Sequence, residues 1–149
     1  MTVFDIRPYD GSGPLRLGMS PSEVHAAIGE QPRNTLFNDK GERDEDYPVL
    51  SACYSAGEDK LVEFAHTSAV DVRFQGVSLF TTPNAVDLLV AADGAPLEGL
   101  GFVVFPNLGI ALADFDSDRE SDRVVQVFER GRWESIAHLK PYRVKRGAI

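Results

Sequence analysis

The sequence LGMSPSEVHAAIGEQP at positions 17–32 decides the fold expected for this chain. Ser20 is a favourable helix N-cap, and Pro21 follows at the first helical position, where its missing N–H costs nothing. Glu23 completes a capping box with Ser20. Apolar residues recur at i, i+3 and i+4 from Val24 onward, and Gly29 ends the pattern. This stretch therefore predicts a short amphipathic helix.

A similar stretch, LFTTPNAV, begins 62 residues later at positions 79–86. It predicts a second helix with Thr82 as N-cap and Pro83 at the first helical position. Apolar residues again share one face, and Gly94 and Pro96 supply the end signals. The matched cap, proline, apolar face and stop indicate an internal duplication.

Strand signals surround both helices. Val3, Phe4 and Ile6 indicate an extended lead-in, and alternation of apolar and polar residues marks the clearest strand, at 69–75. A turn at 56–59 predicts a hairpin between two of the strands. Polar segments at 38–48 and 114–122 are expected to be loops. The predicted strands lie at 49–55, 60–66, 69–75, 101–105, 108–115, 123–130 and 131–139.

Together these signals predict an α+β fold made of two tandem helix-plus-antiparallel-strand repeats. The repeats would span about 15–76 and 77–139 and would form one curved sheet with the short helices on one face. We expect a single domain over 1–149, because a chain of this length usually forms one domain. Residues 140–149 form a basic tail, which we expect to lie over the protein's own acidic loops.

The opening at 17–24, followed by Ile28-Gly29 and Pro32, resembles the helical start of the small outer-membrane lipoprotein family (SmpA/OmlA, or BamE). Its tandem arrangement resembles the β-lactamase inhibitor protein fold, in which two helix-plus-sheet units share one long curved sheet. The resemblance implies a shape only. The chain has no lipobox cysteine, which puts the membrane role in doubt. Its single cysteine, Cys53, cannot form the disulfides of the inhibitor, which puts β-lactamase as a target in doubt.

Composition narrows the classes of partner. The chain has 149 residues, 43% hydrophobic and 26% charged, which is ordinary globular usage. Its 15 Lys and Arg against 23 Asp and Glu give a net charge of −8, so nucleic acid is a poor partner. The N-terminus lacks a basic start followed by an apolar run, and the apolar stretches are too short to span a bilayer. We therefore expect a cytoplasmic protein with no membrane partner.

The chemistry-bearing residues predict no catalytic site. Cys53 has no local signature of a nucleophile and reads as a small buried hydrophobe. The alternating acids at 114–122 lack the glycine and glutamate of a calcium loop, and His25, His66 and His138 have no zinc spacing. Glu63 and Asp71 lie on neighbouring predicted strands and could face each other, although solvent-facing charges near Arg73 are the simpler interpretation. We expect no metal, no cofactor and no enzymatic activity.

Alternation on the two strands that precede Gly76 and Gly131 predicts a binding surface. If Val72 and Val127 face the helices, their neighbours project from the opposite face. Arg and aromatic side chains are enriched at interfaces, so this face is a candidate partner-binding surface. Burial of the two aromatics beneath the lead-in segment is an equal alternative. The candidate residues are Arg73, Gln75, Gln126, Phe128, Arg130 and Trp133.

The leading functional hypothesis is a non-catalytic protein-binding module, with an inhibitor or a toxin-neutralising immunity protein as the expected form. The acidic loops of the chain would favour a basic protein partner, such as a toxin or an enzyme. Two alternatives stay open. One is a small-ligand-binding regulatory protein or an enzyme with a pocket between the repeats, and the other is a structural module that dimerises through a free strand edge. The sequence names neither the partner nor the oligomeric state.

Overall fold

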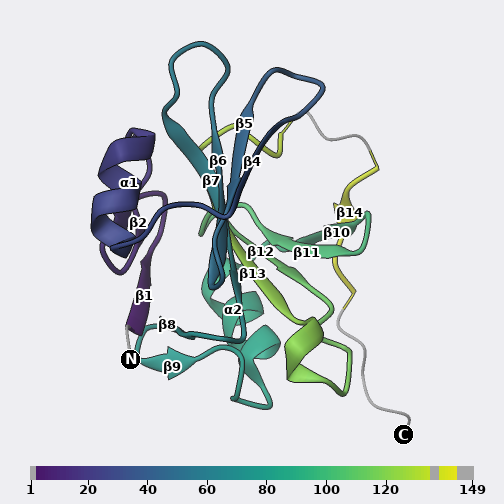
Figure 1. Ribbon diagram of the computed structural model, residues 1–149. Coiled ribbons are helices and arrows are strands. Elements are labelled where there is room, and N and C mark those ends of the chain that lie inside the picture. The colour runs from purple at the N-terminus through teal and green to yellow at the C-terminus, as the bar shows by residue number, and fades with distance from the viewer. Residues whose placement is uncertain (1–2, 135–137, 144–149) are drawn as a thin grey trace, which may run out of the picture.

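The structure is a computed structural model of the chain, and it describes residues 3–134 and 138–143. Two sheets and two short α-helices make up the described fold (Figure 1). The larger sheet has nine antiparallel strands in the order β14-β10-β11-β12-β13-β7-β6-β5-β4. Their bounds are β4 Asn34–Phe37, β5 Arg43–Asp46, β6 Leu50–Tyr54, β7 Leu61–Thr67, β10 Leu97–Gly99, β11 Phe102–Phe105, β12 Ile110–Ala113, β13 Val124–Phe128 and β14 Lys140–Pro141.

The smaller sheet has five strands in the order β3-β2-β1-β8-β9. The lead-in strand β1 pairs in parallel with β8, which places Phe4 opposite Val72. The bounds are β1 Val3–Arg7, β2 Gly11–Ser12, β3 Leu15–Arg16, β8 Asp71–Phe74 and β9 Val77–Ser78. The helices are α1 Pro21–Ile28 and α2 Ala85–Asp93, and a 3₁₀ turn, η1, covers Glu120–Asp122.

The predicted fold class is wrong. The protein is mostly β, with 38% of the described residues in strands against 14% in helices, and its strands form two sheets instead of one. The strand predicted at 69–75 forms as β8, but it leaves the large sheet to pair with β1. The reason is that a strand's own alternation sets which side chains are buried, whereas its partner is chosen by long-range packing.

Helix α1 forms as its capping residues predict. The Glu23 backbone N–H donates to Ser20 Oγ at 3.2 Å, and the Ser20 backbone N–H donates to Glu23 Oε1 at 3.1 Å. Pro21 is the first helical residue, and Gly29 ends the helix with a φ of 85° in the left-handed region. Both the start and the end of this helix are therefore set by interactions that span only a few residues.

Helix α2 begins later than predicted. Its N-cap is Asn84, not Thr82, and that side chain makes no capping hydrogen bond. Pro83 therefore precedes the helix, so Pro21 and Pro83 are not equivalent. The buried residues Ala85 and Leu89 anchor α2 instead, which shows that tertiary packing holds the second helix where local capping holds the first.

Two other local predictions are wrong. The polar segment at 38–48 is not all loop, because β5 lies within it and pairs with both β4 and β6. The segment predicted as a strand at 131–139 is a turn over 131–134, while 135–137 lie outside the described residues. The predicted hairpin of β6 and β7 is confirmed.

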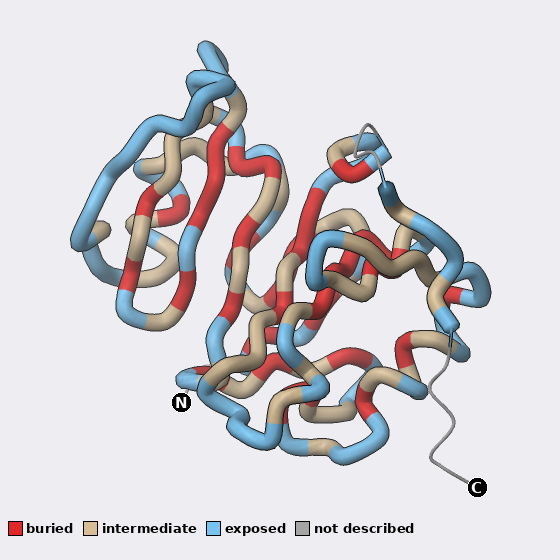
Figure 2. The backbone as a smooth tube through the Cα atoms, turned by 90° about the vertical axis from the view of Figure 1, so that its right-hand side faces the viewer, coloured by how far each residue is buried: buried red, intermediate tan, exposed pale blue. Residues whose placement is uncertain are grey.

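One cluster of buried residues joins both sheets and both helices. It includes Phe4 from β1, Val24 from α1, Leu89 from α2 and Phe64 from β7. Buried residues run along the strands, and exposed residues gather in the connecting loops (Figure 2). A second, smaller cluster lies on the other side of the large sheet and is described below.

Ser12 and His66 connect the two sheets. Ser12 Oγ lies 2.7 Å from His66 Nε2, and both residues are fully buried. The Phe4 ring packs against the imidazole at a centroid distance of 4.5 Å. Burial lowers the pKa of His66, so this histidine is a neutral core residue.

No helix within residues 3–134 and 138–143 has both the length and the apolar character needed to cross a membrane. Of the predicted basic tail, residues 140–143 are described and include β14, which pairs with β10. Residues 144–149 lie outside the described part of the chain.

Candidate functional site

The large sheet has a face that points away from the helices. Phe64 and Val127 pair across β7 and β13 and belong to the core shared with the helices. Because side chains alternate along a strand, their neighbours point to the opposite face. The strand registers arrange these neighbours in two rows: Asp44, Cys53, Glu63 and Phe128 in one, and Asp46, Ser51, Ala65, Gln126 and Ala111 in the other.

One half of this face, over β11 to β13, is covered. Phe128 and Trp133 are 2% and 9% exposed and pack at a ring-centroid distance of 5.6 Å. Phe102 packs on Trp133 at 5.1 Å, and Tyr9 approaches the edge of Phe128 at 6.1 Å. We call this the covered half. It is a small hydrophobic core of its own and leaves no room for a partner.

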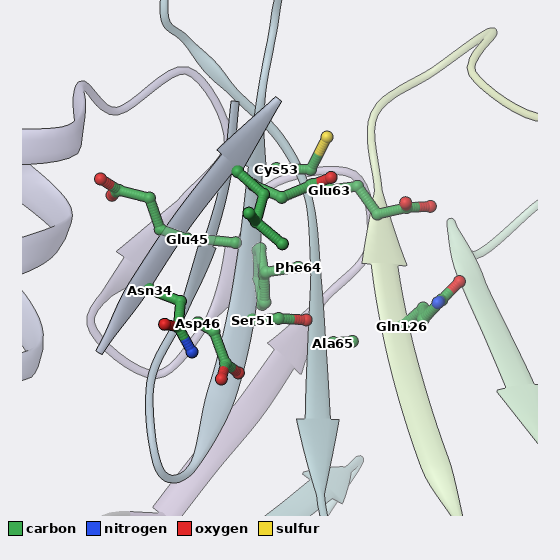
Figure 3. A pocket seen from close by; sticks show the side chains of 12 residues that line it. Asn34, Glu45, Asp46, Ser51, Cys53, Glu63, Phe64, Ala65 and Gln126 are labelled. Carbon is green, nitrogen blue, oxygen red and sulfur yellow. The ribbon is translucent and has the colours of Figure 1, made fainter. Parts of the chain in front are cut away.

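The other half, over β4 to β7, is open and holds a pocket of about 320 Å³. We call this the open half. In Figure 3, Asn34, Asp46 and Ser51 lie toward one end of the pocket and Cys53 and Glu63 toward the other. The Glu45 side chain points away, toward His25 on α1, at 2.9 Å. The lining residues are Asn34, Leu36, Asp44, Glu45, Asp46, Ser51, Ala52, Cys53, Glu63, Phe64, Ala65 and Gln126.

A charged cluster marks the boundary between the two halves. Arg132 Nη1 donates to Glu42 Oε2 at 2.7 Å, and Arg132 Nε lies 3.5 Å from Glu63 Oε2. Trp133 Nε1 donates to Glu63 Oε1 at 2.9 Å. The side chains of Arg132, Glu42 and Glu63 are 20%, 12% and 19% exposed. One arginine and one indole thus fix the turn after β13 against two mostly buried carboxylates.

The two carboxylates have opposite electrostatic environments. The hydrogen bond from Arg132 lowers the pKa of Glu42 from 4.5 to about 2. Burial raises the pKa of Glu63, although Arg132 and Trp133 oppose that shift. Such a pair resembles an acid–base arrangement, but every strong donor nearby is already used to hold the turn. The geometry therefore indicates a structural clamp.

Cys53 lies beside this clamp. Its Sγ is 3.4 Å from Arg132 Nη2 and 3.7 Å from Glu42 Oε1. Burial raises the pKa of the Cys53 thiol, and the nearby Asp44 raises it further. A thiol that stays protonated is a poor nucleophile. The thiol therefore packs as a small buried group.

The edge of the open half is strand β4, the last strand of the nine. All four of its residues are exposed, and Leu36 and Phe37 are 69% and 64% exposed. Leu36 lines the pocket. The Arg43 guanidinium lies over the Phe37 ring, 5.4 Å from the ring centroid. A fully exposed edge strand with two large apolar side chains is uncommon in a protein that remains monomeric.

The six predicted partner-binding residues do not form one surface. Arg73 lies on β8 of the smaller sheet, bonded to Asp71, and Gln75 is in the turn that follows. Phe128 and Trp133 are buried in the covered half. Arg130 is exposed above the Tyr9 ring at 4.1 Å. Only Gln126 lines the pocket of the open half.

The postulated pair of Glu63 and Asp71 is also not formed, because β7 and β8 belong to different sheets. Asp71 instead bonds Arg73 at 2.8 Å, as the simpler interpretation expected. The acidic loop at 114–122 is organised by Ser117, whose hydroxyl donates to Asp122 at 2.7 Å. Within the described residues, no group of three or more His, Cys, Asp or Glu is arranged to hold a metal ion.

Sequence reasoning missed Leu36, Phe37, Glu42 and Arg132. Leu36 and Phe37 are adjacent apolar residues between polar segments, and that isolated pair was the available signal for an edge strand. Glu42 and Arg132 are 90 residues apart in the chain, so no local pattern could connect them.

No family model matches the chain, and neither a curated protein nor a solved structure matches it. The resemblance to the BamE-like unit and to the inhibitor fold therefore stays a prediction.

Proposed function

We propose that this protein is a non-catalytic protein-binding module that captures an extended segment of a partner along strand β4. The observation that carries this proposal is the exposed edge strand with Leu36 and Phe37 beside the pocket. In strand addition, backbone hydrogen bonds supply affinity, and pockets for alternate side chains supply specificity. The exposed backbone edge of β4 could supply the hydrogen bonds, and the pocket beside Leu36 could receive side chains of the partner.

The backbone of β4 supports this mode of binding. The Asn38 backbone N–H donates to Glu42 O at 3.0 Å, and the strand register continues with Phe37 opposite Arg43. Because inward and outward backbone groups alternate in an antiparallel pair, Asn34 and Leu36 direct their N–H and C=O groups toward β5. The N–H and C=O groups of Thr35 and Phe37 then point outward, where a partner strand would pair.

Charge favours a basic segment. Four of the described residues that line the pocket are acidic and none is Lys or Arg, although the Glu45 side chain points away toward His25. Asp46 bonds Arg33 at 3.1 Å and Glu63 bonds Arg132, whereas Asp44 makes no ion pair with any described residue. A lysine or arginine of the partner that enters beside Leu36 would meet Asp44. Complementary charge of this kind accelerates encounter and selects partners.

The biological form we propose is a cytoplasmic inhibitor or immunity protein whose partner is a basic toxin or enzyme. A non-catalytic role is supported by Cys53, whose raised pKa keeps the thiol protonated, and by the donors of the Arg132 clamp, which are already bonded to Glu42 and Glu63.

The test uses a synthetic peptide of alternating lysine and valine, and a glutamate–valine peptide as its charge control. Fluorescence anisotropy should show saturable binding of the basic peptide, weakened by salt. Thr35→Pro removes one outward N–H without removing a bond to β5, so it should reduce affinity by about tenfold. Thr35→Val keeps that N–H and should bind like the wild type.

Two outcomes would overturn the proposal. Equal binding by the proline and valine variants would show that β4 does not pair with the peptide. Light scattering that shows a stable dimer, lost in the Thr35→Pro variant, would instead make β4 an interface between two copies.

A further inference from the structure

A second, larger cavity lies away from the open half and shares no lining residue with it. Its volume is about 550 Å³, which is within the usual range for small-molecule sites. Its walls come from the start of α2, from β10 to β12, from the loop after β12 and from β14. The clamp and the β4 edge make no part of it.

The walls of this cavity combine two kinds of side chain. Apolar and aromatic residues line it: Val86, Phe102, Val103, Leu112, Phe115 and Tyr142. The Phe102 ring itself packs on Trp133 on the other face of the sheet, so Phe115 and Tyr142 supply the aromatic surface. Four carboxylates are spread among them, from Asp87 on α2, Glu98 on β10, and Asp114 and Asp116 in the loop after β12. Lys140 is the single base among the described residues of the lining, which together carry a formal charge of −3.

The carboxylates act on a shared space. Burial raises the pKa of Tyr142, and the negative charges of Asp87, Glu98 and Asp116 raise it further. These three residues come from three separate segments, and all three line the same cavity as Tyr142. Lys140 neutralises little of this charge, because its Nζ is 3.9 Å from Glu98 and its side chain is 72% exposed.

The spacing of the groups selects the class of ligand. A small inorganic cation needs several oxygens that converge within bonding distance, and no group of three or more His, Cys, Asp or Glu residues is arranged in that way in the described part of the chain. An organic cation suits both the acidic and the apolar side chains of the lining. Its ammonium group pairs with the carboxylates, and its hydrocarbon body packs on the apolar surface. Aromatic rings attract such a charge by a cation–π interaction, as Phe115 already does with the Arg123 guanidinium, 5.7 Å from its ring centroid.

We propose that this cavity binds an organic cation that carries an ammonium or amidinium group on an aliphatic or aromatic body. The cation contacts Asp87 and Asp116 at its charged end and packs against Phe115 and Tyr142. This site is independent of the proposed capture of a partner at β4.

The experiment titrates the full chain with phenethylamine, with spermidine, with 2-phenylethanol as a neutral molecule of similar shape, and with calcium chloride alone. Backbone amide shifts are followed by ¹H–¹⁵N NMR. We expect saturable shifts with at least one of the two amines, confined to the segments that line the cavity. The alcohol should bind at least about tenfold more weakly than phenethylamine where that amine binds.

Matched variants separate the site from general acidity. The double variant Asp87→Asn with Asp116→Asn should weaken amine binding by about tenfold or more. The control, Asp39→Asn with Asp118→Asn, removes the same charge from exposed positions outside the cavity and should bind like the wild type.

Four outcomes would overturn the proposal. The first is that neither amine binds, and the second is that phenethylamine and the alcohol bind equally well. The third is that calcium shifts the same amides at lower concentration than the amines do. The fourth is that both double variants lose amine binding equally. The Thr35→Pro variant should bind the amines normally, so failure at this cavity is distinguishable from failure at β4.

Discussion

The covered half and the open half of one sheet face share the same strand alternation and differ in what lies over them. Over β11 to β13, the turn at 129–134 places Trp133 on Phe128, and the face becomes a small core. Over β4 to β7, no described segment supplies an equivalent cover, and the same face holds a pocket lined by both acidic and apolar residues. The outward residues differ as well: they are apolar where the turn covers the sheet, as at Ala111 and Phe128, and include Asp44, Asp46 and Glu63 where it does not. The comparison teaches that a covering segment and the side chains beneath it together decide whether a sheet face becomes a core or stays open.

The largest expected effect lies in the covered half. Trp133→Ala removes a side chain that packs on Phe102 and Phe128 and donates to Glu63. We expect the free energy of unfolding to fall by about 3–5 kcal/mol, measured by urea denaturation. A loss below about 1 kcal/mol would show that this half is not a core.

The clamp between the halves should give a smaller effect. Arg132→Met keeps the aliphatic stem but leaves Glu42 and Glu63 without their shared cation. We expect a loss of about 2 kcal/mol, because two mostly buried carboxylates lose a charged donor. The matched control is Arg119→Met. The Arg119 side chain is 80% exposed and pairs with Asp122, so its replacement should change the free energy of unfolding by less than about 0.5 kcal/mol.

The same clamp should make stability depend on pH. The pKa of Glu42 is lowered from 4.5 to about 2, so its carboxylate stabilises the fold fully above pH 4.5. That contribution is lost as the pH falls from 4.5 toward 2. Burial raises the pKa of Glu63, which acts with the opposite sign. Glu42→Gln should therefore flatten the rise of unfolding free energy between these pH values by about 1–2 kcal/mol. Parallel curves for the variant and the wild type would contradict this.

The smallest effect on stability should come from the open half. Leu36→Ser alters a side chain that is 69% exposed, so the unfolding free energy should stay within about 0.5 kcal/mol of the wild type. If β4 captures a partner segment, the same change should still weaken binding of the lysine–valine peptide. A large stability loss with unchanged peptide binding would reverse the roles assigned to the two halves.

Part of the site was accessible from the sequence. The alternation on β13 correctly separated Val127 from Gln126 and Phe128. The same reasoning could not show that Arg73 and Gln75 lie away from this face, because β8 pairs with β1 in the smaller sheet. It also could not place Trp133, since burial of that indole depends on a turn that folds back over β13.

The sequence by itself determined helix α1 and the inward positions of the strongly alternating strands. Those features depend on neighbours a few residues apart, such as the hydrogen bonds between Ser20 and Glu23. Tertiary structure decided the division into two sheets, the exposure of β4 and the joining of Glu42 to Arg132. The pairing of strands, and the ion pair between residues 90 positions apart, depend on which surfaces of the protein pack together. Short stretches of sequence do not contain that information.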